Sequence, residues 1–105
     1  MNLVCEKGVL KGSVEIPASK SHTIRAVAIA SLADGESVIR QPLDSQDARS
    51  AVSAYRALGA EIETQAGVWR VKGVDGVPRV PANVIDVANS GTTLNIALGS
   101  CALVR

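Results

Sequence analysis

Two cations and three hydroxyl groups lie within one short segment, PASKSHTIR, that begins at Pro17 and ends at Arg25. Pro17 favours an extended conformation before it, and Ser19 is a good N-cap for a helix that follows. Ser21 and Arg25 share one face of that helix, and Lys20 lies in its first turn. Because a helix N-terminus favours negative charge, the segment predicts an anion site. The alternative is that Lys20 and Arg25 are only solvated surface cations.

A second hydroxyl-rich segment, NSGTT at residues 89–93, has a similar character. Residues 14–25 align without a gap on residues 84–95, and a Val, an Ala and a Thr recur at the same places in both. If these are equivalent parts of a repeated unit, two helix N-termini can converge on one pocket and hold more than one anionic group. Short segments of this kind also resemble each other by chance, so one repeat is only suggestive.

Three helices that position these segments are predicted from apolar residues spaced three or four apart. The first follows Ser19 and ends at Gly35; the second is capped by Asp44 or Ser45 and ends at Gly59; the third runs from 89–93 to the last residue. Asp47 occupies the capping-box position of the second helix and is expected to be structural. The expected apolar faces are, in chain order, Ile24, Val27, Ala28 and Leu32; Ala48, Ala51, Val52, Tyr55 and Leu58; Leu94, Ala97, Leu98 and Cys101.

Short strands are predicted between the helices from alternating apolar residues and turn signals. Residues 4–16 are expected to form a hairpin or two strands, and residues 36–40 and 84–87 one strand each. A hairpin across Ala66-Gly67 is expected to place Trp69 and Val71 on one face. Residues 75–83 are expected to form a loop.

Composition limits the function classes that fit. Eleven basic and ten acidic residues nearly balance in this chain of 105 residues, and Trp69 and Tyr55 are the only aromatic residues, so nucleic-acid binding is not expected. No apolar run approaches the ~20 residues of a membrane span, and the N-terminus lacks a signal-peptide pattern. Cys5 and Cys101 lack the spacing of metal ligands, so we expect free thiols in a cytoplasmic protein. His22, the single histidine, leaves no multi-histidine metal site and is expected at the surface.

Five ordered motifs resemble the enolpyruvyl transferases. They are GSVEIP before Lys20-Ser21 and Arg25, SLADG at 31–35, LDSQD at 43–47, LGA at 58–60 and NSGTT at 89–93. The branch of that family that acts on UDP-N-acetylglucosamine normally has Asn after the equivalent lysine. Ser21 and Arg25 therefore favour the branch that acts on shikimate 3-phosphate.

The resemblance implies an α/β (α+β) fold of repeated βαβαββ units with parallel helices, arranged in two domains with the substrates between them. This chain, residues 1–105, resembles the N-terminal portion of such proteins, about one unit and the start of a second. Residues 1–16 are expected to be first strands that pair with the other domain, and residues 17–105 to be part of the N-terminal domain. The family's acid/base carboxylates would follow Arg105, and Asn95 stands where the family usually has Arg.

The reaction implied by the resemblance transfers the carboxyvinyl group of phosphoenolpyruvate to the 5-hydroxyl of shikimate 3-phosphate, in aromatic amino-acid biosynthesis, with no metal or organic cofactor. By the resemblance, Lys20 is the catalytic residue of this chain and contacts both substrates, chiefly phosphoenolpyruvate. Ser21 and Arg25 bind shikimate 3-phosphate. The remaining C-terminal part, covalent or as a second chain, is the expected partner, and the isolated chain is expected to be inactive.

By the same resemblance, Gly91 allows the backbone to approach phosphoenolpyruvate closely, and Asn89 and Thr92 shape that turn. Taken without the resemblance, Gly91 can be only a turn residue and Thr92 only a first-turn hydroxyl. Two alternatives therefore stay open: a non-catalytic phosphate-binding module, and a portion of a UDP-N-acetylglucosamine enolpyruvyl transferase.

Overall fold

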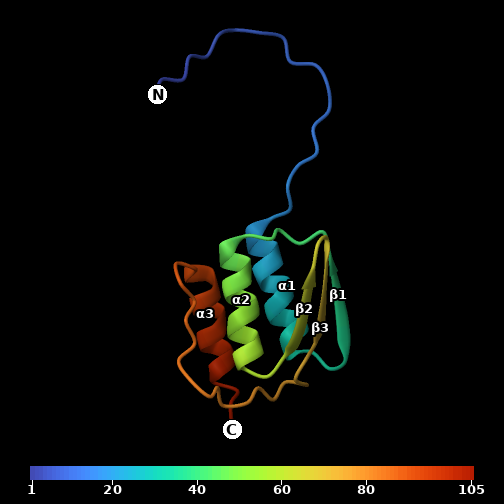
Figure 1. The fold of residues 1–105 in the computed structure, drawn as a ribbon, viewed down its shortest axis with the longest axis vertical. Coiled ribbons are helices and arrows are strands. Elements are labelled where there is room, and N and C mark those ends of the chain that lie inside the picture. The colour runs from blue at the N-terminus through green and yellow to red at the C-terminus, as the bar shows by residue number, and fades with distance from the viewer.

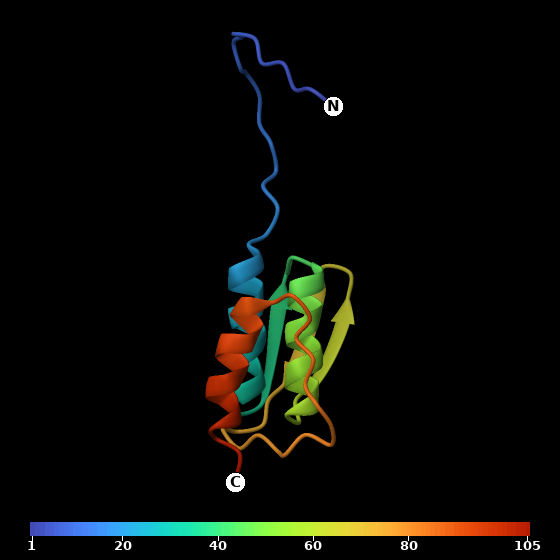
Figure 2. The same ribbon diagram turned by 90° about the vertical axis from the view of Figure 1, so that its left-hand side faces the viewer.

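Three parallel helices and a three-stranded sheet form the body of the chain in the computed structural model, which describes residues 1–105 (Figure 1). The elements are α1 (Lys20–Leu32), β1 (Glu36–Arg40), α2 (Gln46–Ala57), β2 (Glu61–Gln65), β3 (Val68–Lys72) and α3 (Gly91–Cys101). Helices α1 and α2 contact the sheet, and α3 packs against these two helices (Figures 1 and 2). No helix has the length and apolar character that crossing a membrane requires. The mixed helix and sheet class predicted from the sequence is confirmed.

The sheet has the order β1-β3-β2, and both pairs are antiparallel. Val71 of the central strand pairs with Ser37 of β1 and Ile62 of β2. The predicted hairpin between β2 and β3 is confirmed, and Gly67 in its turn has φ +74°, which favours glycine. The alternation of Trp69 and Val71 with charged neighbours leaves one face apolar towards the helices and one face polar towards solvent.

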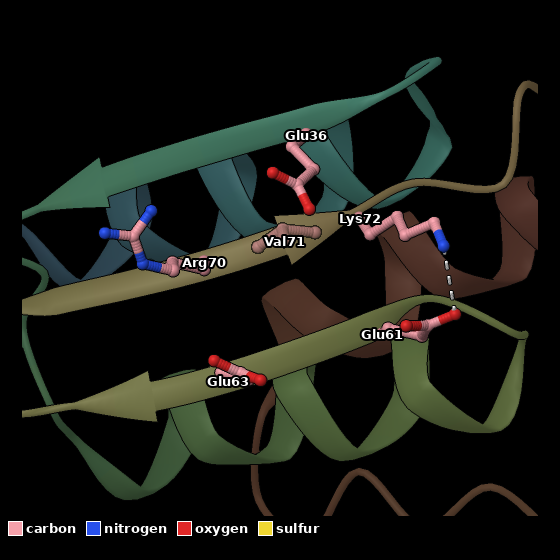
Figure 3. Close-up of a pocket in the computed structure, with 6 residues that line it drawn as sticks. All are labelled: Glu36, Glu61, Glu63, Arg70, Val71 and Lys72. Atoms are coloured by element: carbon pink, nitrogen blue, oxygen red, sulfur yellow. Dashed lines mark ion pairs between the residues drawn. The ribbon is translucent and has the colours of Figure 1, made fainter.

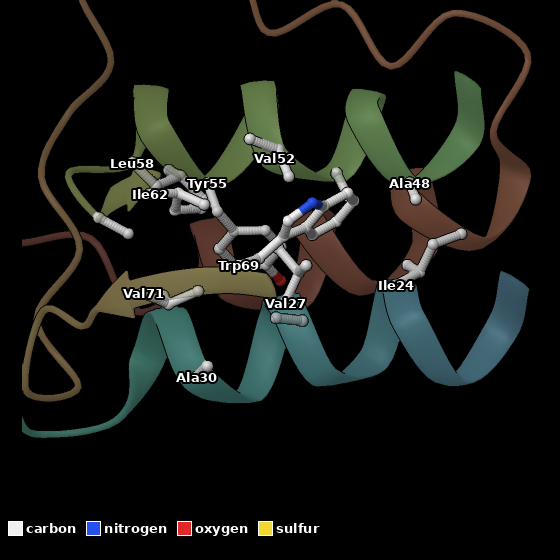
Figure 4. Close-up of a cluster of buried hydrophobic side chains, with 13 residues drawn as sticks. Ile24, Val27, Ala30, Ala48, Val52, Tyr55, Leu58, Ile62, Trp69 and Val71 are labelled. Carbon is white, nitrogen blue, oxygen red and sulfur yellow. The ribbon is translucent and has the colours of Figure 1, made fainter. Parts of the chain in front are cut away.

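A single core of thirteen buried residues lies between the sheet and helices α1 and α2 (Figure 4). Trp69 and Tyr55 are its largest side chains, each 1% exposed. All five predicted apolar positions of α2 are buried, as are three of the four on α1, whereas Leu32 is only partly buried. The spacing of apolar residues therefore predicted the inner faces of these two helices.

The hairpin or two strands predicted at residues 4–16 and the strand predicted at residues 84–87 do not form within this chain. Residues 4–16 form no strand, are exposed throughout and project away from the body (Figure 1). Residues 84–87 also form no strand, although Ile85 and Val87 are half-buried. A strand needs a neighbouring strand to receive its backbone hydrogen bonds, and neither segment has one. The expected loop at residues 75–83 is confirmed.

The helix ends are partly corrected. Helix α1 ends at Leu32, before Gly35, and α3 ends at Cys101, before the last residue. Helix α2 is capped by Ser45, whose side chain accepts a hydrogen bond from the Ala48 N–H. Asp47 therefore stands one position too early for a capping box. The predicted stop at Gly59 is confirmed by its φ of +112° just after the helix.

The predicted apolar face of α3 is also wrong. Only Ala97 of the four predicted residues is buried, and α3 instead buries Thr93 and Ser100. Small residues allow a close approach to α1 and α2. Leu94 and Leu98 remain exposed, and together with Ile85 and Val87 they line a shallow apolar hollow beside α3.

Candidate functional site

The N-terminus of α1 has the cap that the sequence predicted. Ser19 has extended backbone angles, and its Oγ accepts a hydrogen bond of 3.3 Å from the His22 N–H. His22 is exposed, as expected. The Lys20 ammonium lies 2.9 Å from an Asp47 carboxylate oxygen in α2, and the Lys20 side chain is 51% exposed. This pair joins the first turns of two helices, and half of the lysine side chain stays open to solvent.

Arg25 lies one turn further along α1 and folds back towards the helix N-terminus. Its Nη1 donates a hydrogen bond of 3.2 Å to the Ser21 carbonyl, and the Arg25 side chain is exposed. Ser21 is half-buried. The helix therefore places Arg25 and Ser21 on one face, as their spacing predicts, and the guanidinium keeps other N–H groups for a ligand.

Thr23 connects α1 to the segment that leads into α2. Its hydroxyl donates to the Ser19 carbonyl at 2.9 Å and accepts from the Leu43 N–H at 3.0 Å. The residue is buried. Its two bonds fix the start of α1 against the motif at 43–47.

Helix α3 begins with a second cap, Ser90, which accepts a hydrogen bond of 3.2 Å from the Thr93 N–H. The Ser90 hydroxyl also donates to Thr93 Oγ1 at 2.7 Å, and this oxygen lies 3.5 Å from the Asp47 carbonyl, at the long limit of a hydrogen bond. Asn89, which the repeat aligns with the Ser19 cap, is not the cap but lies exposed just before it. Ala88 has φ +48°, a strained conformation for alanine that fixes the approach to this turn.

Gly91 is the first residue of α3 and is exposed, while Thr92 beside it is half-buried. The φ angle of Gly91 is not positive, and a Cβ added to Gly91 would meet no atom within 4 Å. The turn itself therefore does not require glycine. The space in front of this backbone is open.

The first turns of the three helices lie at the same end of the bundle (Figure 1). Asp47 is the residue that joins them, since Lys20 of α1 contacts its carboxylate and Thr93 of α3 approaches its carbonyl. It is also the only acidic residue in the three first turns. Three positive dipole ends with Lys20 and Arg25 nearby make this end of the molecule suitable for anions.

The sequence pattern predicts only a structural role for Asp47 and does not predict its contact with Lys20. Helical spacing relates residues of one helix, whereas these two residues belong to different helices. The signal that points to Asp47 is its place at the end of the LDSQD motif, at residues 43–47.

The candidate site is an open surface. A hollow of about 460 Å³ adjoins it and is lined by residues 15–18 and 41–43. A second hollow, of about 100 Å³, lies on the solvent face of the sheet (Figure 3). There Lys72 Nζ lies 3.6 Å from Glu61 Oε1, and Arg70 stands in register opposite Glu63. Acidic and basic side chains alternate on that face, so it does not attract one sign of charge.

Three titratable groups outside the site have shifted pKa values: Asp44, Arg49 and Tyr55. The hydrogen bond to Asp44 raises the pKa of Arg49. The bidentate hydrogen bond from Arg49 holds the pKa of Asp44 below its usual value, with oxygen to nitrogen distances of 2.6 Å and 2.7 Å. Burial raises the pKa of Tyr55, and its hydrogen bond of 2.7 Å with Ser100 opposes that rise.

Comparison with known proteins identifies the family. The family model for EPSP synthase (3-phosphoshikimate 1-carboxyvinyltransferase) matches residues 4–105. A 3-phosphoshikimate 1-carboxyvinyltransferase from Acetivibrio thermocellus is 52% identical over 103 residues, which cover 98% of this chain and 24% of that relative. One from Methanococcus aeolicus is 50% identical over 91 residues, covering 86% of this chain and 21% of the relative.

Solved structures agree with the sequence relatives. The structure of an EPSP synthase from Acinetobacter baumannii matches with a TM-score of 0.76 and 28% identity, over 85% of this chain and 20% of that one. The chain thus spans about a quarter of the length of the curated relatives that it matches. On the family match over residues 4–105 and the agreement in fold, this chain belongs to the EPSP synthase family.

Proposed function

We propose that this chain forms the N-terminal part of a 3-phosphoshikimate 1-carboxyvinyltransferase and supplies part of its substrate site. The completed protein transfers the carboxyvinyl group of phosphoenolpyruvate to the 5-hydroxyl of shikimate 3-phosphate and releases phosphate. The observation that carries the proposal is the meeting of three helix N-termini beside Lys20 and Arg25, in a chain that is 52% identical to a protein of that name. We place the protein in the cytoplasm, which its two free, exposed cysteines support.

Lys20 and Arg25 have different roles in this proposal. Both substrates are polyanions, and cations fixed in a cleft that closes around them stabilise negative charge more than exposed cations do. The Lys20 ammonium faces phosphoenolpyruvate and acts as the catalytic residue of this chain, since it meets the group that gains charge during addition and elimination. Arg25 and Ser21 bind shikimate 3-phosphate, because the planar guanidinium can form a bidentate pair with a carboxylate or phosphate.

The turn at the start of α3 lies against phosphoenolpyruvate in this proposal. Gly91 presents open space at a helix N-terminus, where the backbone N–H groups of the first turn have no partner within the helix. Thr92 follows Gly91, and Asn89 lies two residues before it. The 2.7 Å hydroxyl contact between Ser90 and Thr93 holds the turn in shape.

Residues 1–16 pair as strands with the second domain in this proposal. Seven large apolar side chains of this segment are exposed, and none of its backbone groups forms a hydrogen bond within the chain. Such a segment can add to a sheet edge, where both its backbone groups and its apolar side chains find partners.

The test is an activity assay of a completed enzyme. We define this as residues 1–105 fused to the remaining C-terminal part of the Acetivibrio thermocellus relative. We expect the isolated chain to be inactive and the completed enzyme to form phosphate and the carboxyvinyl product. Lys20→Ala and Arg25→Ala should each lower kcat/KM of the completed enzyme by at least ~100-fold, as the loss of one charge-stabilising group does.

The melting temperatures of both variants should stay within about 3 °C of the parent, because both side chains are exposed and their pairs contribute little to stability. If each variant lost melting temperature as well as activity, the result would show that these residues are structural. Binding of phosphoenolpyruvate without turnover would favour the phosphate-binding module instead.

A further inference from the structure

The ion pair between Lys20 and Asp47 stabilises the charge of the lysine more than it stabilises the charge of the aspartate. Asp47 stands in the first turn of α2, where the helix dipole and free N–H groups already stabilise a carboxylate. Lys20 is the first residue of α1, and the same dipole repels its ammonium. Asp47 therefore has favourable surroundings without Lys20, whereas Lys20 needs Asp47 to stay at this position.

The geometry leaves the ammonium available to a ligand. One oxygen of Asp47 lies 2.9 Å from Nζ, and an ammonium has three donors, so two donors remain. The Lys20 side chain is 51% exposed and that of Asp47 only 27%. Asp47 thus holds the lysine from the protein side, and a ligand can approach from the solvent side.

The backbone on both sides of Asp47 is fixed by hydrogen bonds of its neighbours. The Ser45 cap accepts a bond from the Ala48 N–H, and the Leu43 N–H is bonded to Thr23 of α1. Thr93 of α3 approaches the Asp47 carbonyl at 3.5 Å. A lysine loses much side-chain entropy when it is ordered, and a carboxylate on this fixed backbone imposes part of that order before a substrate binds.

We propose that Asp47 is a positioning residue: its carboxylate holds the Lys20 ammonium where the three helix N-termini meet, towards the turn at residues 89–92. The inference rests on the proposed function and adds to it the group that sets the direction of Lys20. Asp47 touches no substrate in this arrangement and acts through Lys20 alone.

The experiment compares two carboxylates of the same motif in the completed enzyme. In Asp47→Asn, the charge that holds Lys20 is lost and the shape of the side chain is kept. We expect kcat/KM for phosphoenolpyruvate to fall by about tenfold or more, the typical effect of losing a group that orients a reacting one. The KM for shikimate 3-phosphate should change less than about twofold, because Arg25 does not contact Asp47.

Asp44→Asn is the matched control. Asp44 lies three residues away and forms its ion pair with Arg49, at 2.6 Å and on the surface, without contact to Lys20. We expect its kinetic constants and melting temperature to stay near those of the parent.

A double-mutant cycle separates positioning from a general structural effect. In the Lys20→Ala background, measured by single-turnover assays, Asp47→Asn should change the residual rate less than about twofold. An equal effect of Asp47→Asn in both backgrounds would overturn the inference, and so would kinetics of Asp47→Asn that match those of Asp44→Asn.

If Asp47→Asn does not fold, Asp47→Ser, which keeps a first-turn hydroxyl, takes its place in the same cycle. A completed parent enzyme without activity overturns the proposed function and this inference together, whereas an active parent with an unaffected Asp47→Asn variant overturns the inference alone.

Discussion

Gly91 offers a clear test at the scale of a single residue, because its backbone does not need glycine. It lies at the first position of α3 without a positive φ, and an added Cβ meets no protein atom within 4 Å. In the completed enzyme, we expect Gly91→Ala to raise the KM for phosphoenolpyruvate by about tenfold, the scale of one misplaced methyl group in a tight pocket. The KM for shikimate 3-phosphate should stay nearly unchanged.

Gly99→Ala is the control for this prediction. Gly99 also lies in α3, is exposed and has open space for a Cβ, but it stands at the far end of the helix. Both substitutions should leave the melting temperature unchanged or slightly higher, because alanine favours a helix. Steady-state kinetics with each substrate varied in turn, together with thermal unfolding, measure both effects. A lower melting temperature for Gly91→Ala with equal effects on both substrates would show that Gly91 serves only the turn.

Residue-level features were predictable where they depend on neighbours in the chain. The Ser19 cap and the shared face of Ser21 and Arg25 follow from spacings of three and four, and both are present. The contact between Lys20 and Asp47 was not predictable in this way, since it requires two helices to pack side by side. Polar residues that meet between elements are the part of the site that local spacing does not determine.

At the scale of elements, the docking of α3 onto α2 depends on a buried hydroxyl pair. Tyr55 Oη lies 2.7 Å from Ser100 Oγ, and Ser100 Oγ also lies 3.1 Å from the Ile96 carbonyl. We expect Tyr55→Phe to lower the free energy of unfolding by about 1 kcal/mol, the net value of one such bond. Ser100→Ala removes the same bond, so the loss in the double variant should be smaller than the sum of the single losses. Chemical denaturation of the isolated chain measures these values, and additive losses would contradict a direct contribution of the bond.

Tyr55 also makes the stability of the folded chain depend on pH. Burial raises the pKa of Tyr55 in the folded chain, so the neutral phenol is favoured in the folded state over the unfolded one. Its contribution to stability is present in full below the unfolded pKa, ~10, and is lost as the pH rises through the raised folded value. Because Tyr55 is the only tyrosine, ultraviolet absorbance of tyrosinate reports this group alone. Tyr55→Phe should lose less stability than the parent above pH ~10.

The sequence correctly predicted the helices and strands that pack against other parts of this chain. Helix α2 and the β2–β3 hairpin have apolar residues spaced for the core, and both formed. The segments at 4–16 and 84–87 have the same alternation but no strand beside them. Alternation shows that a segment is suited to a sheet, and it does not supply the neighbouring strand.

At the scale of the whole molecule, the N-terminal segment does not pack against the body of the chain. Residues 1–14 are exposed throughout and form no hydrogen bonds with the rest of the chain. Deletion of residues 2–14 should therefore leave the melting temperature of the isolated chain within about 2 °C of the parent, because it removes no core contact. Differential scanning calorimetry measures this value.

The same deletion should have the opposite consequence in the completed enzyme. There we propose that residues 1–16 pair with the second domain, so that their loss exposes a sheet edge of that domain and weakens the connection between the two domains. Activity should then fall by at least ~100-fold although the body of the chain is folded, since the substrates are no longer enclosed. Replacing Val9 and Leu10 with Ala keeps the length of the segment and should give a smaller loss, because the backbone can still pair. Full activity after deletion of residues 2–14 would contradict the pairing, and a lower melting temperature of the isolated chain would show that the segment packs on its own body instead.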